Sequence, residues 1–212
     1  MFKIKKSVGR LYILLRSLPF RLRYRNTFVL GKNCIIHKCK VYNPQKGKVI
    51  VGDNCSLINC RFHFEEGKNR VVISNGVKLN GAEFIERYGG DNLISIGENT
   101  TTGVCQFEAS EGASLCVGED CMFSYDVKVW AAAHHSILDS NGKRINPTKS
   151  IIIGNHCWIG HSSFIMKGSI VPNGSIVGTA SLFIGEFTCE NSVYAGIPAR
   201  KIKENISWTR KL

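Results

Sequence analysis

The sequence predicts an all-β fold, a parallel β-helix in which short strands wind into a three-sided prism. Two observations lead to this prediction. An apolar residue stands at every sixth position from Ile153 to Phe183, and an aliphatic residue followed by Gly or Ser recurs less regularly along residues 30–154. Apolar positions six apart fit neither the 3.6-residue period of a helix nor the simple alternation of a flat strand.

The regular repeat covers six consecutive units. Its apolar positions are Ile153, Ile159, Ile165, Val171, Val177 and Phe183. Four residues after the apolar position, five of the six units carry a small residue: Cys157, Ser163, Ser169, Ser175 and Ser181. Three such units to a coil would point one aliphatic side chain per strand into the prism, with the small residue beside it. Glycine follows the aliphatic residue at 154, 160 and 178 and would ease the bend there.

Upstream, an aliphatic residue followed by Gly or Ser recurs at residues 30, 51, 73, 96, 117 and 153, at intervals of 21, 22, 23, 21 and 36 residues. Coils of eighteen residues with a few inserted residues explain the first four intervals. Residues 131–150 break the repeat inside the last interval and contain the turn signal Asn141-Gly142. We expect a protruding loop there.

The nine cysteines fit this repeat better than they fit a disulfide framework. Cys34, Cys55, Cys121 and Cys157 each follow an aliphatic residue by four, at the small buried position, where a free cysteine behaves as a small hydrophobe. The sequence contains no Cys-x-x-Cys pair, so it does not suggest a zinc site of that kind. No signal peptide or apolar run long enough to span a membrane is evident, so the sequence favours a reduced, cytoplasmic location.

Charge is concentrated at the start of the chain. Residues 1–52 hold 13 of the 28 Lys and Arg and no acid, so the net charge of +12 belongs to the first quarter. We divide the chain into a basic amphipathic helix over 1–26, a β-helix domain over 27–198 and a tail over 199–212. In that tail, Ile202 and Ile206 suggest a short helix. Residues 1–25 could attract anionic lipid and place the protein at the inner membrane surface, or they could simply cap the open end of the prism. No stacking motif or nucleic-acid fold accompanies the charge, so nucleic acid is not expected as a partner.

The repeat, the loop at 131–150 and the run at 195–200 together resemble the hexapeptide-repeat acyltransferases. Within that family, residues 135–147, 153–160 and 203–208 are most similar to the capsular and sialic acid O-acetyltransferases, and the specific resemblance covers 117–208. It implies a left-handed β-helix that assembles as a homotrimer, with active sites between subunits. The implied reaction carries acetyl from acetyl-CoA to a hydroxyl of a sugar or surface polysaccharide, with no metal.

A sugar hydroxyl needs a general base before it attacks a thioester, and histidine titrates in a suitable range. Counting back from Ile137, the family pattern Asp-x-His-x-Ile places the catalytic histidine at His135, with His134 as second choice. The family's aspartate falls on Ala133, so Asp126, Glu108 or a backbone carbonyl would have to orient the imidazole instead.

The resemblance also assigns the acyl donor. It places Trp158 beside the reacting groups, although a subunit interface would equally explain an outward-facing tryptophan. By position in the motif, the residues implied to bind acetyl-CoA are Trp158, Gly160, His161, Thr179, Ala180, Arg200, Lys201 and Lys203. Related sugar enzymes have a lysine near 184–188 that this chain lacks, and a solvated tail is the alternative for the last three.

Three other functions are compatible with the same fold. One is an N-acyltransferase acting on an amino sugar, whose amine needs less help from a base. A second is a scaffold without catalysis, which the alanine at 133 would suit. The third is a zinc enzyme like the γ-class carbonic anhydrases, for which His156 and His161 have the right spacing and His135 is the third candidate ligand.

Overall fold

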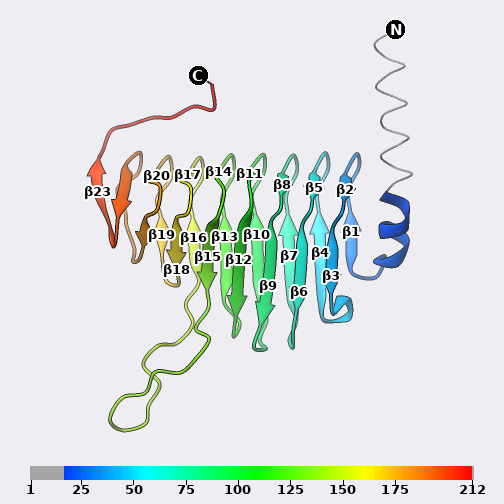
Figure 1. Ribbon diagram of the computed structural model, residues 1–212, viewed down its shortest axis with the longest axis horizontal. Coiled ribbons are helices and arrows are strands. Elements are labelled where there is room, and N and C mark those ends of the chain that lie inside the picture. Colours follow the sequence, from blue (N-terminus) through cyan, green and yellow to red (C-terminus); the bar gives the residue numbers. More distant parts are fainter. Residues whose placement is uncertain (1–16, 212) are drawn as a thin grey trace.

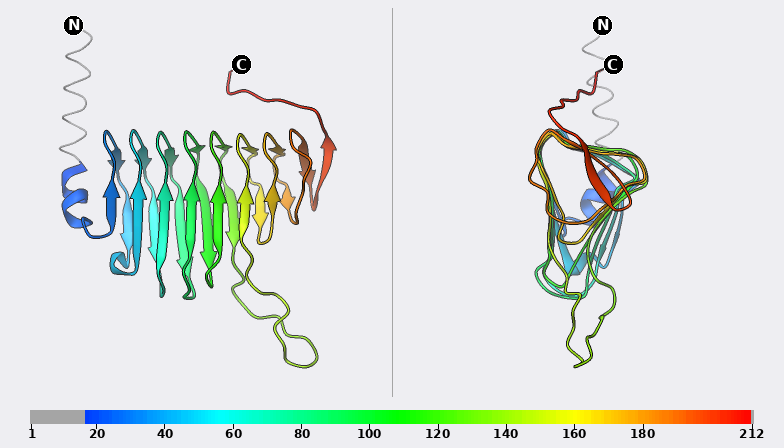
Figure 2. Two further views of the ribbon diagram at one scale, coloured as in Figure 1. Left: turned by 180° about the vertical axis from the view of Figure 1, so that it is seen from behind. Right: turned by 90° about the vertical axis from the view of Figure 1, so that its left-hand side faces the viewer.

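In the computed structural model, the chain winds into a three-sided prism whose walls are three parallel sheets (Figure 1). The structure describes residues 17–211, and the statements below concern that part of the chain. Each turn of the prism adds one strand to each sheet, and the cross-section is triangular when viewed along the long axis (Figure 2). The predicted parallel β-helix is therefore confirmed.

The sheets are named A, B and C in the order in which the chain meets them. Sheet A contains β1 (Phe28–Leu30), β4 (Gly47–Val51), β7 (Asn69–Ile73), β10 (Leu93–Ile96), β13 (Ser114–Val117), β16 (Ile151–Ile153) and β19 (Ile170–Val171). Sheet B contains β2 (Ile35–His37), β5 (Ser56–Ile58), β8 (Lys78–Asn80), β11 (Thr101–Thr102), β14 (Met122–Phe123), β17 (Trp158–Ile159), β20 (Ile176–Val177), β22 (Val193–Gly196) and β23 (Ala199–Lys203). Sheet C contains β3 (Lys40–Tyr42), β6 (Arg61–Phe64), β9 (Glu83–Arg87), β12 (Cys105–Ser110), β15 (Val127–Ala131), β18 (Phe164–Met166) and β21 (Leu182–Phe183). A 3-10 turn, η1 (Pro44–Lys46), lies between β3 and β4.

Side chains that point inward stack in columns along the prism. On sheet C, Phe62, Phe84 and Phe107 stand in register on adjacent strands, with ring centroids 5.0 and 5.5 Å apart. Every sixth-position residue predicted from 153 to 183 is buried, as are the four serines beside them. Cys34, Cys55, Cys121 and Cys157 are also buried and free, as a packing role requires. The repeat thus identified the core correctly.

The N-terminal end of the prism is covered by a helix over residues 17–23. Phe20 and Tyr24 pack against Phe28, and the Phe28 ring meets Phe62 edge-on at 5.2 Å, so this end of the core is not open. Of the helix predicted over 1–26, residues 17–23 are helical, and residues 1–16 lie outside the described residues. No helix among the described residues is long and apolar enough to cross a membrane.

The prediction of a C-terminal helix over 199–212 was wrong. Residues 199–203 form β23, which pairs antiparallel with β22, and residues 204–211 run as an extended tail. The last coil leaves an open sheet edge, and β23 satisfies its backbone groups, which a short isolated helix could not do. Ile202, which suggested the helix, is 65% exposed.

The predicted loop is present and leaves the prism between β15 of sheet C and β16 of sheet A (Figure 1). β13 pairs directly with β16, so the long interval is one coil with an insertion. At the tip, Asp139 Oδ1 accepts hydrogen bonds from the amides of Asn141 and Lys143, each 2.9 Å long, and Gly142 has a φ of +77°. The Asn-Gly turn read from the sequence is therefore where it was expected.

Candidate active site

The first of the two adjacent histidines has a buried carboxylate as its partner. Nε2 of His134 lies 2.8 Å from Oε1 of Glu108, whose side chain is only 2% exposed, whereas that of His134 is 35% exposed. Glu108 stands on β12 beside Trp130 of β15, and His134 follows β15 by three residues. The pair thus joins the base of the loop to a rigid strand.

The Glu108–His134 pair lies among aromatic and basic side chains. The His134 ring centroid is 5.4 Å from that of Trp130 and 6.3 Å from that of Tyr88. Nε of Arg87 is 3.6 Å from Oε1 of Glu108, so the carboxylate lies between a guanidinium and an imidazole. With these groups around it, the His134 side chain is still 35% exposed.

His135 is placed differently. Its side chain is exposed and makes no hydrogen bond or ion pair within residues 17–211; only its carbonyl is used, accepting from Nδ2 of Asn146 at 2.8 Å. Glu108 binds His134 instead, and Asp126 accepts a hydrogen bond from Ser162 at 3.0 Å. Neither carboxylate that the sequence offered for His135 therefore reaches it.

The base of the loop is fixed to the prism. Arg144 donates two hydrogen bonds to the Glu111 carboxylate, at 2.8 and 3.0 Å, and this pairing lowers the pKa of Glu111. Nζ of Lys167 donates to the carbonyls of Asn146 and Pro147 at 2.8 and 2.9 Å. The Glu108–His134 contact where the loop begins and the Arg144 and Lys167 contacts where it returns fix both ends of the loop, and the tip projects beyond them.

On sheet B, Trp158 stands on the outer face of β17 and is 38% exposed. Beside it runs a strip of small residues on successive strands, because Gly160, Gly178 and Ala195 occupy matching positions after the paired inward residues, and Ala195 pairs with Arg200. A Cβ added at Gly160 would lie 2.7 Å from the amide nitrogen of Thr179, so the close approach of the next coil requires glycine there. We call this strip, with the Trp158 ring beside it, the sheet B track.

The other predicted acyl-donor residues border this strip. The amide of Ala180 donates to the carbonyl of His161 at 2.8 Å, which places these two residues and Thr179 at the corner between sheets B and C. Arg200, Lys201 and Lys203 lie on β23, at the far end of sheet B. The residues predicted to bind the donor thus lie on sheet B or at its corner with sheet C.

The C-terminal tail returns along the corner between sheets A and B, which sequence reasoning did not foresee. Trp208 stacks on His156 with centroids 4.2 Å apart, donates from Nε1 to the His156 carbonyl at 2.8 Å, and lies 6.1 Å from the Trp158 ring. Arg210 binds Asp120, which also holds Nδ1 of His156 at 2.7 Å. The tail therefore adds an aromatic edge to the track beside Trp158.

The two halves of the predicted site do not meet within one chain. His134 lies where the loop leaves the corner between sheets C and A, whereas Trp158 lies on sheet B, and Figure 1 shows the loop projecting away from the sheet B strands. A site that uses both residues would need two copies of the chain.

The described residues contain no group of three or more His, Cys, Asp or Glu side chains that could hold a metal ion. His156, proposed for a zinc site, is instead bound to Asp120 and to the carbonyl of Trp208 at 3.1 Å. His156 therefore binds the corner between sheets A and B and the C-terminal tail.

Comparison with known proteins identifies the family. No family model matches the sequence. A polysialic acid O-acetyltransferase from Neisseria meningitidis is 32% identical over 165 residues, which span 77% of this chain and 76% of the relative. The chain belongs to the hexapeptide-repeat O-acetyltransferases.

Solved structures support the same assignment. The acetyltransferase resembles the crystal structure of the polysialic acid O-acetyltransferase OatWY with a TM-score of 0.74 and 28% identity, covering 87% of this chain and 92% of the other. The match confirms the left-handed β-helix that the resemblance implied. AntD, an N-acyltransferase from Bacillus cereus crystallised with dTDP and 3-hydroxybutyryl-CoA, shares the fold with a TM-score of 0.52 and 20% identity, over 88% of this chain and 87% of its own.

Proposed function

We propose that this acetyltransferase moves acetyl from acetyl-CoA to a hydroxyl of a bacterial surface polysaccharide or its precursor. The relatives named above support the acceptor, because two of them are polysialic acid O-acetyltransferases. Acetyl-CoA is a cytoplasmic metabolite, so the proposal places the reaction in the cytoplasm.

The observation that carries the mechanism is the buried Glu108 carboxylate at 2.8 Å from His134. A carboxylate that accepts the Nε2 proton fixes the tautomer and leaves Nδ1 free to act as base. The hydroxyl gives its proton to Nδ1 while its oxygen bonds to the thioester carbon. The tetrahedral intermediate then collapses, the carbon–sulfur bond breaks, and the imidazolium returns the proton to the departing thiolate.

This assignment exchanges the order of the two histidines. The motif favours His135, and the carboxylate partner favours His134. Both remain within the loop at the same corner, so the proposed chemistry is the same and only the side chain that performs it differs.

The sheet B track suits acetyl-CoA. The glycine and alanine strip carries no bulky side chain beside Trp158, so a narrow pantetheine arm could lie along it, and strand backbone there could bind its amides. Arg200, Lys201 and Lys203 at the end of the track supply positive charge for the phosphates. When bound, acetyl-CoA would supply the activated acyl group.

We further propose that the enzyme is a homotrimer whose sites lie between neighbouring copies. The support is that His134 lies at the corner between sheets C and A, whereas Trp158 lies on sheet B of the same prism. The loop of one copy would bring its imidazole to the sheet B track of the next.

Mass spectrometry of surface polysaccharide from cells with and without the gene tests the proposed function. We expect a mass increase of one acetyl group per modified sugar only where the gene is present, and restored acetylation when purified enzyme and acetyl-CoA are added to polysaccharide from the deletion strain. Identical spectra together with no transfer in vitro would contradict the proposal.

We propose a peripheral membrane contact at the N-terminal end. Leu18 and Leu22 are 47% and 63% exposed on the helix face opposite the packed Phe20, amid bases that favour anionic lipid. We expect the full chain to bind phosphatidylserine vesicles more strongly than phosphatidylcholine vesicles, and less at high salt.

Changing Leu18 and Leu22 together to serine should weaken binding to phosphatidylserine vesicles by at least about tenfold, since buried leucines contribute over 1.4 kcal/mol each. Val29→Ser, at an exposed apolar site on β1, is the matched control. If the wild-type chain does not bind vesicles, this helix acts only as a cap over the core.

A further inference from the structure

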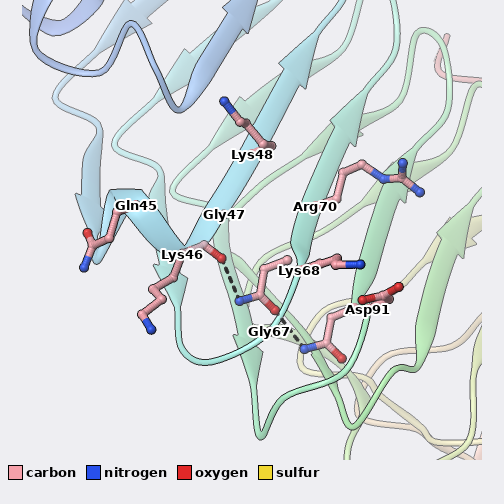
Figure 3. Close-up of a pocket in the computed structure, with 10 residues that line it drawn as sticks. Gln45, Lys46, Gly47, Lys48, Gly67, Lys68, Arg70 and Asp91 are labelled. Carbon is pink, nitrogen blue, oxygen red and sulfur yellow. Dashed lines mark hydrogen bonds between the residues drawn. The ribbon is translucent and has the colours of Figure 1, made fainter.

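A hollow of about 390 Å³ lies where sheet C turns into sheet A, in the first coils of the prism (Figure 3). Four bases line it: Lys46 at the end of η1, Lys48 on β4, Lys68 before β7 and Arg70 on β7. Asp91 is the single acidic residue in the lining. The hollow is therefore strongly positive.

The floor of the hollow is rigid. Nδ2 of Asn92 donates to Oδ1 of Asn69 at 2.9 Å, and Nδ2 of Asn69 donates to the Lys46 carbonyl at 3.0 Å, as the dashed lines in Figure 3 show. Both asparagines are buried. A Cβ added at Gly67, whose φ is +112°, would lie 2.3 Å from the Gly90 carbonyl. The shape is thus set by the turns and not by mobile side chains.

The positive charge is not neutralised by the protein. None of the four bases forms an ion pair with a carboxylate anywhere in residues 17–211. Lys48 and Arg70 stand opposite each other on adjacent strands, an arrangement that destabilises a sheet. Burial raises the pKa of Glu86, which accepts from the Arg70 amide, to about 8, so this nearby carboxyl is uncharged at neutral pH. Lys48 donates from Nζ to the Asn26 carbonyl, which is a neutral group, so its charge stays unpaired as well.

The hollow shares its corner with the proposed catalytic base. At the corner between sheets C and A, Lys68 lies on one turn and Tyr88 on the next. The loop with His134 leaves this corner three turns after Lys68. At about 4.8 Å per turn, Lys68 lies roughly 14 Å from that loop along the prism, and Asp91 in the same lining roughly 10 Å from it. One sugar ring cannot span either distance, but an extended oligosaccharide can.

We propose that this basic hollow is a remote subsite for the acceptor, binding acidic sugar units several residues away from the hydroxyl that receives acetyl. The inference rests on the proposed function and adds that the acceptor is a polymer that carries carboxylates. Arg70 can bind a sugar carboxylate with two hydrogen bonds, and Lys68, which extends to the same side in Figure 3, adds a point charge. Lys46 and Lys48 extend to the other side of the hollow and add to its positive potential. Binding at the hollow would lower the KM for long chains without changing the chemical step.

The test uses the double variant Lys68→Gln/Arg70→Gln, which removes two exposed charges from the hollow. The matched control, Lys32→Gln/Lys38→Gln, removes two exposed bases from other corners of the first coil. Acceptors are fragments of graded length from the surface polysaccharide of the source cells. Transfer kinetics are measured for each length, and fragment binding is measured by calorimetry without acetyl-CoA.

We expect the hollow variant to raise KM for long fragments by at least about tenfold and to weaken their binding in calorimetry equally. The kcat for the shortest accepted fragment should not change, and the control variant should behave as wild type. Equal KM values and equal binding in wild type and variant at every length would overturn the subsite, as would the same loss in the control. Because calorimetry does not depend on turnover, binding without acetyl transfer would contradict the proposed function and leave the subsite standing.

Discussion

Replacing His134 with alanine is expected to lower the rate of acetyl transfer by about 10²–10⁴-fold, the contribution typical of a general base. His135→Ala should retain most of the wild-type rate, because of these two adjacent histidines only His134 has a carboxylate within 2.8 Å. The adjacent position makes this an unusually close control: both side chains are in the same loop, and both substitutions remove an imidazole. The measurement is kcat with saturating acetyl-CoA and polysaccharide from a strain that lacks the gene.

Glu108→Gln separates orientation from charge. The amide can still meet the imidazole, but it cannot hold the Nε2 proton in the same way, so activity should fall between those of wild type and His134→Ala. Thermal unfolding and the oligomeric state must match wild type for each variant. If His135→Ala abolishes transfer and His134→Ala does not, the base is the residue that the motif indicated.

The contrast between the two histidines shows where sequence reasoning stops. The motif count locates the loop, but the partner of the base is 26 residues away, on a strand one coil earlier. Glu108 and His134 come together only because β12 and β15 pair in register. The sequence named Glu108 as one of three groups that could orient an imidazole, and nothing along the chain could say which imidazole it meets.

The fold was predictable because its information is local and repeated. Within each six-residue unit, the pattern alone indicates which residue points inward and which is small. The buried residues from Ile153 to Phe183 could therefore be predicted without knowledge of distant contacts. The C-terminal tail lacks that redundancy. Two isoleucines four apart suggested a helix, whereas the open edge of β22 determined the outcome, and Trp208 found its place through contacts with His156.

A second large effect is expected at Glu86, whose side chain points into the core in line with Phe64 and Ala109. Burial raises its pKa from 4.5 to about 8. Between these values the folded chain keeps a proton that the unfolded chain has released. The stabilisation is complete below pH 4.5 and is lost as pH rises through about 8. At roughly 1.4 kcal/mol per pKa unit, the change amounts to about 3–5 kcal/mol.

Glu86→Gln should therefore remove most of this loss, because a glutamine stays neutral at every pH while keeping nearly the same shape. We expect its Tm to exceed that of wild type at pH 8.5 and to differ little at pH 5. Thermal unfolding between pH 5 and 9 measures the effect, with Glu66→Gln, at an exposed position near the same corner, as the matched control. Parallel profiles for wild type and Glu86→Gln would show that this carboxyl is not the group that titrates. The stability is lost between the pKa values of 4.5 and about 8, while the native carboxyl is still neutral. Only above about pH 8 does Glu86, which accepts from the Arg70 amide, become a negative neighbour of the basic hollow.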